Sequence, residues 1–86
     1  MLWFVYILET TSGKFYTGIT TDVERRFNEH ASGKKGAKFF RSNRPKRVVH
    51  IEEYENRSLA SKREWEIKQL SRKEKEHLVY SSMGPS

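Results

Sequence analysis

The fold is decided by residues 3–19, which read WFVYILETTSGKFYTGI. Residues 3–8 and 14–19 are rich in aromatic and β-branched side chains, a composition typical of strands. The segment between them is polar and ends in Gly13, as turns often do. The stretch therefore predicts a β-hairpin.

The register of this hairpin decides which side chains share a face of the sheet. A loop centred on Thr11 would place Tyr6 opposite Tyr16, with open space beside them at Gly18. A two-residue turn at Ser12 and Gly13 would shift the pairing by an odd step and separate the faces. Tyrosines are also ordinary strand residues, so a purely structural pair and a chemical pair both remain open.

Two further elements follow the hairpin, a helix and a third strand. The run from Thr21 to Glu24 has the form of a capping box, and the apolar spacing after it predicts a helix to about Ser32, ended by Gly33. Residues 47–54 have the composition of a third strand.

Two more helices are predicted at the end of the chain. The first runs over about residues 58–70 and is capped by Asn56 or Ser58. A second capping box, from Ser71 to Glu74, opens a short helix through about Tyr80.

The element order is therefore ββαβαα, in the α+β class. Because the chain is too short for crossover units throughout, a small, mainly antiparallel sheet with helices packed on it satisfies this order best. With 86 residues there is room for one hydrophobic core, so we expect one domain over residues 1–80 and a loose tail over residues 81–86.

Composition narrows the partners and the compartment. Lys and Arg exceed Asp and Glu by 17 to 11, which favours an anionic partner: nucleic acid first, an anionic membrane second. The apolar run at residues 2–8 is too short for a signal peptide or a membrane span. The absence of cysteine excludes disulfides and is compatible with a reducing cytoplasm, where we expect the protein.

The positive charge is concentrated in one segment. Between residues 34 and 47 there are seven cations and no acid, with Phe39 and Phe40 in the middle. This segment is either a solvated basic loop or a grip on the nucleic-acid backbone, in which the phenylalanines stack on bases or pack in the core. The candidate nucleic-acid-binding residues are Lys34, Lys35, Lys38, Arg41, Arg44, Lys46 and Arg47.

Polar side chains occupy two helical positions where the pattern calls for apolar ones. In the first helix Arg26 and His30 share a face with Val23 and Phe27. Either this face borders a cleft, or His30 is an ordinary surface or hydrogen-bonded histidine. In the helix over residues 58–70, Glu64 shares a stripe with apolar neighbours. A carboxylate partly removed from water needs a cation, either a basic side chain in a structural ion pair or a divalent metal.

These residues together resemble a known family. Val5-Tyr6-Ile7, followed ten residues later by Tyr16-Thr17-Gly18, resembles the paired signatures of the GIY-YIG nuclease superfamily. The resemblance extends over about residues 3–80 and is nearest to the small stand-alone bacterial proteins of the YhbQ type. It implies a three-stranded antiparallel sheet flanked by helices. The departures are Val5 for glycine, Thr17 within the second motif, and Ile19 where some repair nucleases of the superfamily carry lysine.

The resemblance also implies a site. Arg26 and His30 match the arginine and the His or Tyr that follow the second motif, and Glu64 matches the metal-binding glutamate. The implied reaction is hydrolysis with one Mg²⁺ or Mn²⁺ held by Glu64. Tyr6, favoured over Tyr16, deprotonates or orients the water. Arg26 stabilises the phosphorane, and His30 donates a proton or orients a tyrosine.

The resemblance therefore implies a metal-dependent endonuclease, with DNA favoured over RNA as its substrate, suited to repair or to processing of branched or single-stranded structures. Two rivals remain: a non-catalytic nucleic-acid-binding module of the same fold, and a protein-interaction domain that docks its basic face on an acidic partner.

Overall fold

A computed structural model of the protein describes residues 1–32 and 43–82. Its elements occur in the predicted order, which confirms the α+β class: β1 (Trp3–Thr10), β2 (Phe15–Thr20), α1 (Val23–Ser32), β3 (Pro45–Tyr54), α2 (Arg57–Lys68) and α3 (Arg72–Ser82). Gly33, Lys34, Lys35, Lys38, Phe39, Phe40, Arg41 and the tail from residue 83 lie outside the described residues.

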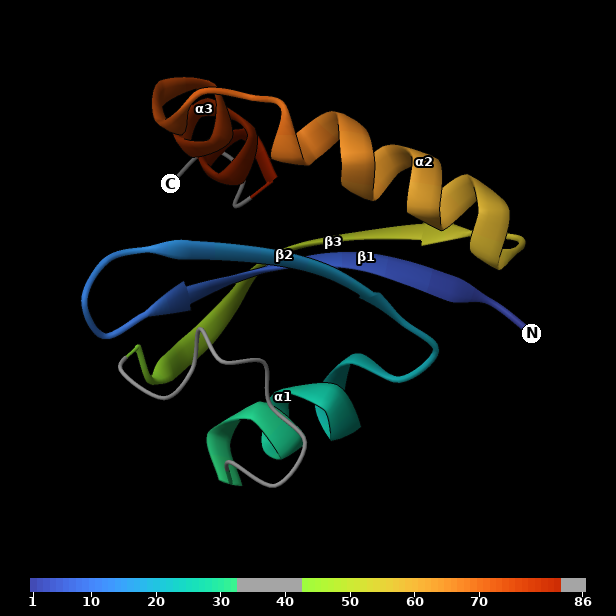
Figure 1. The fold of residues 1–86 in the computed structure, drawn as a ribbon, viewed down its shortest axis with the longest axis horizontal. Coiled ribbons are helices and arrows are strands. Elements are labelled where there is room, and N and C mark those ends of the chain that lie inside the picture. The colour runs from blue at the N-terminus through green and yellow to red at the C-terminus, as the bar shows by residue number, and fades with distance from the viewer. Residues whose placement is uncertain (33–42, 83–86) are drawn as a thin grey trace.

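The strands form one antiparallel sheet in the order β2-β1-β3, so β1 is the central strand. Helix α1 covers one face of this sheet, and α2 with α3 covers the other (Figure 1). Because side chains alternate along a strand, β1 sends successive residues into two different cores. Val5 and Ile7 pack with residues of α2 and α3, whereas Tyr6 and Leu8 pack with residues of α1.

The turn between β1 and β2 sets the register. The Thr10 amide donates to the Lys14 carbonyl at 2.9 Å, and the Gly13 amide donates to the Thr10 carbonyl at 2.9 Å. Gly13 has a φ of 83°, a conformation that glycine adopts without steric cost. The result is a three-residue loop with glycine at its left-handed position, one of the common hairpin connections.

This loop corrects the predicted pairing. The centre of the hairpin lies at Ser12 rather than Thr11, so Tyr6 pairs with Gly18, and Tyr16 pairs with Leu8. The shift is an even number of residues, and the two tyrosines therefore remain on the same face. They are diagonal neighbours, with ring centroids 6.4 Å apart.

The helix boundaries follow local capping chemistry. The first helix is capped by Asp22, whose carboxylate accepts from the Arg25 amide at 3.0 Å; the predicted cap at Thr21 is wrong. Of the two predicted caps, Asn56 is the one that caps α2. The helix begins at Arg57, one residue before the expected start, and ends at Lys68, two residues before the expected end.

The last capping box is confirmed in both directions. Ser71 Oγ accepts from the Glu74 amide, and the Glu74 carboxylate accepts from the Ser71 amide. The helix that it opens continues to Ser82, two residues beyond the predicted end at Tyr80.

A polar network fastens α2 to β3. The Glu52 carboxylate accepts two hydrogen bonds from Arg63, at 2.8 and 3.2 Å, and one from Tyr54 at 2.5 Å. His50 Nε2 lies 2.6 Å from the same carboxylate. Burial acts to raise the pKa of Glu52, but the hydrogen bonds from Arg63, Tyr54 and His50 outweigh it and hold the pKa at about 2. This network fixes α2 against the sheet at the residue before Glu64.

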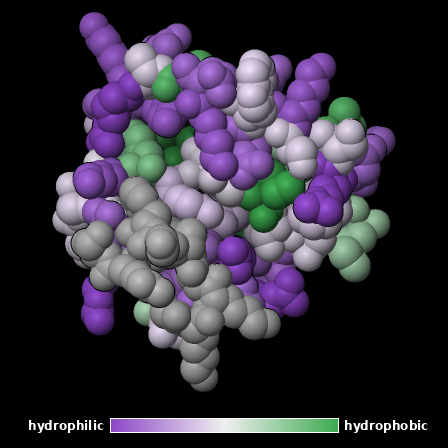
Figure 2. Space-filling model, in the orientation of Figure 1, coloured by the Kyte–Doolittle hydropathy of each residue, from purple (hydrophilic) through white to green (hydrophobic). Residues whose placement is uncertain are grey.

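The surface is largely polar. The face in Figure 2 carries mostly hydrophilic side chains with separate hydrophobic patches between them. None of the helices over residues 1–32 and 43–82 has the length and apolar character needed to cross a membrane.

Candidate active site

The site is built around the Tyr6 side chain, which lies across the neighbouring strand β2 on top of Gly18. A Cβ atom at residue 18 would come within 2.6 Å of the Tyr6 hydroxyl oxygen and 2.8 Å of its Cζ. The space expected to be open at Gly18 is therefore filled by Tyr6, and only a residue without a side chain allows this ring position. Tyr6 is 2% exposed.

Helix α1 brings His30 to this tyrosine. The Tyr6 hydroxyl and His30 Nε2 lie 3.1 Å apart, a hydrogen-bonding distance. The His30 ring also meets the Tyr16 ring edge-on, with centroids 5.4 Å apart. His30 is buried because it lies on the face of α1 that packs on the sheet, as the predicted helical stripe requires.

Arg26 lies one turn before His30 on the same helix. Its guanidinium forms an ion pair with Glu29, at 3.1 Å, and it also hydrogen-bonds to Tyr6. An arginine can only donate, so the Tyr6 oxygen is the acceptor. Four of the predicted site residues are thus in one cluster, contributed by β1, β2 and α1: Tyr6, Tyr16, Arg26 and His30.

The electrostatics of the cluster keep Tyr6 protonated. Burial raises the pKa of Tyr6 to about 12, and the charges of Tyr16 and Glu64 act in the same direction. The hydrogen bond and the positive charge of Arg26 oppose this rise without cancelling it. At neutral pH the tyrosine is therefore a hydrogen-bond donor rather than a phenolate.

The pKa of His30 is shifted in the opposite direction to that of Tyr6. Burial lowers the pKa of His30 to about 4, and the Arg26 charge lowers it further, while Glu29 opposes the shift. The imidazole is therefore neutral at pH 7, and one of its nitrogens can accept a proton. With Arg26 donating to the Tyr6 oxygen, His30 Nε2 is the natural acceptor for the hydroxyl proton of Tyr6.

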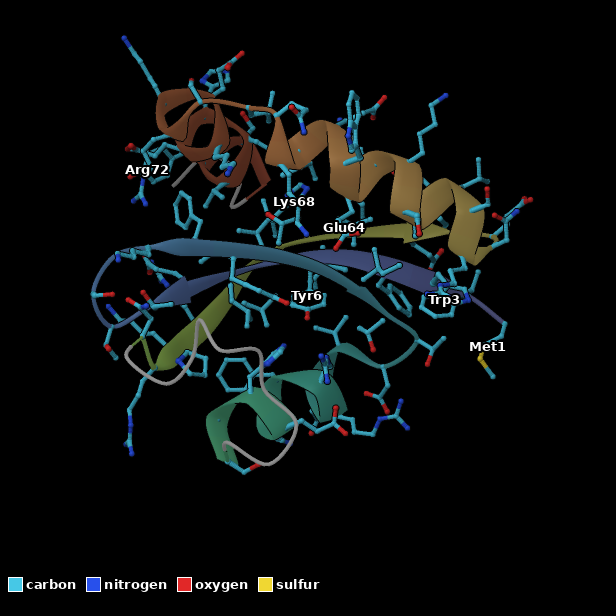
Figure 3. The ribbon with its side chains drawn as sticks, viewed as in Figure 1. Met1, Trp3, Tyr6, Glu64, Lys68 and Arg72 are labelled. Carbon is cyan, nitrogen blue, oxygen red and sulfur yellow. The ribbon has the colours of Figure 1, made fainter. Side chains whose placement is uncertain are left out.

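Glu64 comes from the other layer. It lies on α2, which packs on β2 and β1, and Figure 3 shows it on the side of the helix that faces the sheet. Its side chain is 24% exposed, and its carboxylate pairs with Lys68 at 3.3 Å, one turn later. Its charge reaches far enough to raise the pKa of Tyr6. Glu64 is thus coupled to the cluster electrostatically. Of the two partners predicted for it, a basic side chain or a divalent metal, the structure shows the basic side chain, which is Lys68.

The donor set is compatible with a divalent cation of a particular kind. Among the described residues no three His, Cys, Asp or Glu side chains come together as a metal site. Glu64 would supply one carboxylate oxygen ligand, which suits a hard cation such as Mg²⁺ that keeps most of its waters. It does not suit Zn²⁺, which needs three or four protein ligands.

Three of the predicted nucleic-acid-binding residues lie in the described part of the basic segment. Arg44 directly precedes β3, Lys46 is its second residue, and Arg47 on β3 forms an ion pair with Glu9 at 2.9 Å. Sequence reasoning missed the acidic partner of Arg26 and did not identify Lys68 as the basic partner of Glu64. Both could have been found, because Glu29 and Lys68 lie at the i+3 and i+4 spacings at which helical side chains meet.

The contact between Tyr6 and Gly18 gives a first prediction. Gly18→Ala should displace the Tyr6 ring, because the added methyl group overlaps the ring and its hydroxyl. We expect a loss of about 1–3 kcal/mol in the free energy of unfolding, the usual cost of overpacking. The His30 imidazole ¹⁵N resonances should also shift as the Tyr6 contact breaks, which NMR would detect.

Gly13→Ala is the matched control. Its φ of 83° makes alanine strained, but no atom lies within 4 Å of the added Cβ. It should therefore lower stability by about 1 kcal/mol and leave the His30 resonances unchanged. If Gly18→Ala also leaves the His30 resonances unchanged, the position of the Tyr6 ring does not depend on Gly18.

The lowered pKa of His30 gives a second prediction, for stability against pH. The folded protein binds this proton only near pH 4, whereas the unfolded chain binds it near 6.5. The contribution of neutral His30 is therefore complete above pH 6.5 and is lost as the pH falls towards 4. Its full size is about 3 kcal/mol by proton linkage. Urea unfolding between pH 7 and pH 4.5 measures it.

Two variants isolate the effect of His30. His30→Gln should flatten the dependence of the free energy of unfolding on pH over this window, whereas His77→Gln, at an exposed position, should leave it unchanged. Glu52 does not interfere, because its contribution is lost only below its ordinary pKa, between about 4.5 and about 2. Equal slopes in all three proteins would contradict the assignment.

Comparison with known proteins agrees with this geometry. Residues 2–77 match the GIY-YIG catalytic domain family. The chain is 52% identical to UPF0213 protein DP2720 of Desulfotalea psychrophila over 80 residues, which cover 93% of this chain and 73% of that protein. It is 46% identical to UPF0213 protein YhbQ of Escherichia coli K12 over 82 residues, 95% of this chain and 81% of that protein.

Solved structures have the same fold. The solution structure of UPF0213 protein BH0048 from Bacillus halodurans is 48% identical, with a TM-score of 0.63 over 99% of this chain and 89% of that one. That of EF2693 from Enterococcus faecalis is 35% identical, with a TM-score of 0.65 over 100% of this chain and 91% of that one. From the match over most of its length, this chain belongs to the GIY-YIG catalytic domain family.

Proposed function

We propose that the protein is a metal-dependent endonuclease that hydrolyses phosphodiester bonds in nucleic acid, with DNA as the favoured substrate. The observation that carries the proposal is the cluster of Tyr6, Tyr16, Arg26 and His30 at the edge strand β2. A hydroxyl that hydrogen-bonds both to a neutral imidazole and to a guanidinium brings together groups that phosphodiester hydrolysis needs. Glu64 adds a carboxylate from the opposite layer.

The reaction adds water to phosphorus and breaks the bond to one ester oxygen. One proton must leave the water, and the departing oxygen must gain one. With a pKa of about 12, Tyr6 is present as phenolate in only about 1 molecule in 10⁵ at pH 7. A direct role of Tyr6 as the base is therefore disfavoured, and the proton has to pass through the hydroxyl.

The hydrogen bond to His30 supplies that route. As Tyr6 takes a proton from the attacking water, it gives its own proton to His30 Nε2, 3.1 Å away. Because the pKa of His30 is only about 4, the imidazolium gives the proton up readily, and the departing oxygen receives it directly or through solvent. His30 thus acts as both acceptor and donor, and Tyr6 as the relay between the water and the imidazole.

Arg26 serves the phosphate. Its planar guanidinium can bind two phosphate oxygens at once, which lysine cannot do. Glu29 holds it by one edge, at Nη1, and thereby limits its rotation. A divalent ion on Glu64 would polarise the phosphoryl oxygens and lower the charge that develops on them.

The ion pair between Glu64 and Lys68, 3.3 Å apart, favours a second candidate. If Lys68 is the permanent partner of this carboxylate, the site holds no metal, and the protein is a non-catalytic nucleic-acid-binding module. Only the endonuclease predicts metal-dependent cleavage, whereas both candidates predict nucleic-acid binding.

A third prediction tests the activity. Labelled single-stranded, double-stranded and branched DNA, with matched RNA, should be cut in the presence of Mg²⁺ or Mn²⁺ and not in EDTA. Glu64→Gln should abolish cutting and remove metal binding seen by calorimetry, while the thermal unfolding midpoint stays near that of the wild type.

Glu66→Gln is the control, the same chemical change at an exposed position on the same helix. It should cut at the wild-type rate. Full activity in Glu64→Gln would refute the metal assignment. A large loss of thermal stability without loss of cutting would identify a structural ion pair.

A fourth prediction concerns the relay. Tyr6→Phe keeps the ring on Gly18 but removes the hydroxyl, and should lower the cleavage rate about 10²-fold or more, as should His30→Gln. Because Tyr6 and His30 act on the same proton, the double variant should be little slower than either single one. Tyr80→Phe, at an exposed position, should cut normally. If the effects of the two substitutions on the cleavage rate multiply in the double variant, this would argue against a shared proton path.

A further inference from the structure

A row of cations crosses the molecule on either side of Glu64, outside the basic segment that the sequence indicated. It consists of Arg57 at the start of α2, Lys68 at its end and Arg72 at the start of α3. In Figure 3, Arg72, Lys68 and Glu64 follow one another from left to right, and Trp3 of β1 lies further to the right, below α2. The Arg57 guanidinium lies 5.6 Å from the centroid of the Trp3 ring, so Trp3 shows where Arg57 is.

The spacing of the row follows from helix geometry. Arg57, Glu64 and Lys68 are separated by seven and four residues, so all three lie near one side of α2. At about 1.5 Å per residue these steps are about 10 and 6 Å along the helix axis. They correspond to about three and two nucleotides of a strand that rises about 3.4 Å per nucleotide.

The two arginines at the ends of the row are fixed on aromatic rings. The Arg72 guanidinium lies 4.0 Å from the centroid of Phe15, the first residue of β2. Stacking orders a guanidinium while its N–H groups continue to point outward in the ring plane, where they can donate to phosphate. Arg72 uses Nε for Glu76, at 3.3 Å, and its side chain is still 52% exposed.

Lys68 links the row to the site. Its ammonium lies 3.3 Å from the Glu64 carboxylate, and its side chain is 52% exposed. An ion pair this exposed contributes little to stability, so it is broken at small cost when a competing charge arrives. A divalent cation on Glu64 would take over the neutralising role of Lys68 and release the ammonium for a phosphate.

We propose that Arg57, Lys68 and Arg72 form a track for the sugar-phosphate backbone of one substrate strand, which runs along α2 and places its scissile phosphate at Glu64. The inference rests on the proposed nuclease function and adds the path of the substrate. Since these contacts reach only phosphates, the track binds without sequence preference, and a single strand satisfies it.

The test uses the full chain and a labelled single-stranded oligonucleotide in EDTA, with affinity measured by fluorescence anisotropy over a range of salt concentrations. Arg57→Gln/Lys68→Gln/Arg72→Gln should flatten the slope of log Kd against log salt by at least about 1.4, because each phosphate that the protein no longer neutralises lowers this slope by about 0.7. The two arginines account for this decrease, since without metal Lys68 still pairs with Glu64. Affinity at low salt should fall at least about 10-fold.

Two triple variants control for charge and for packing. Arg25→Gln/Lys62→Gln/Lys73→Gln removes the same charge from exposed positions outside the row and should keep most of the slope. Arg57→Lys/Lys68→Arg/Arg72→Lys retains the charges and should also keep it. An equal decrease of the slope in the two Gln variants, or a decrease in the charge-retaining variant, would overturn the track.

This outcome separates the track from the activity. If the wild-type protein cuts nucleic acid and the row variant binds like the Arg25, Lys62 and Lys73 variant, the nuclease proposal stands and the track is wrong. If the wild-type protein fails to cut in Mg²⁺ or Mn²⁺ but binding weakens only in the row variant, the track stands on a binding module.

Discussion

The rest of the site depends on the contact between the Tyr6 ring and the bare backbone of Gly18. Because no side chain stands at residue 18, the ring crosses the edge strand and brings its hydroxyl to His30 on the helix beyond. Burial there has two effects on proton chemistry. It raises the pKa of Tyr6 to about 12 and lowers that of His30 to about 4, so both groups are neutral at pH 7 and the shared proton rests on Tyr6.

The central strand explains how so small a protein holds these groups in place. Val5 and Ile7 are fully buried against α2 and α3, while Tyr6 and Leu8 are buried against α1. One strand therefore supports both layers, and the charge of Glu64 in the second layer acts on Tyr6 in the first. The hydrogen bonds of Glu52 to Arg63 fix the second layer, which presents Glu64.

Sequence signals that act over a few residues predicted most of the fold. Capping residues and apolar spacing placed the three helices to within two residues, and strand composition placed the hairpin. The register was predicted two residues away, because Gly13 at a positive φ closes a three-residue loop centred on Ser12 rather than on Thr11. The face of each tyrosine survived this error, since an even shift preserves the alternation.

The sequence predicted which candidate residues lie together where they share one helix. It did not predict the contacts that these residues make with other elements. Helical spacing put Arg26 and His30 on one face, and the family resemblance matched them to the tyrosines. The filling of the space at Gly18 could not be deduced, because it depends on where the Tyr6 ring turns. The pKa shifts of Tyr6 and His30 depend on burial, which no local pattern specifies.

The division into two cores also makes the two layers unequal. In α1 a single side chain, His30, is fully buried, whereas α2 buries Ala60 and Ile67 and is held in addition by the Arg63 hydrogen bonds to Glu52. Elements with few buried contacts open first in the native state. Helix α1 is thus the unit most easily detached from the sheet. When it detaches, the His30 imidazole and the Arg26 guanidinium leave together, while Glu64 remains in place. Assembly of the cluster of Tyr6, Tyr16, Arg26 and His30 is therefore a local docking equilibrium, separate from global unfolding.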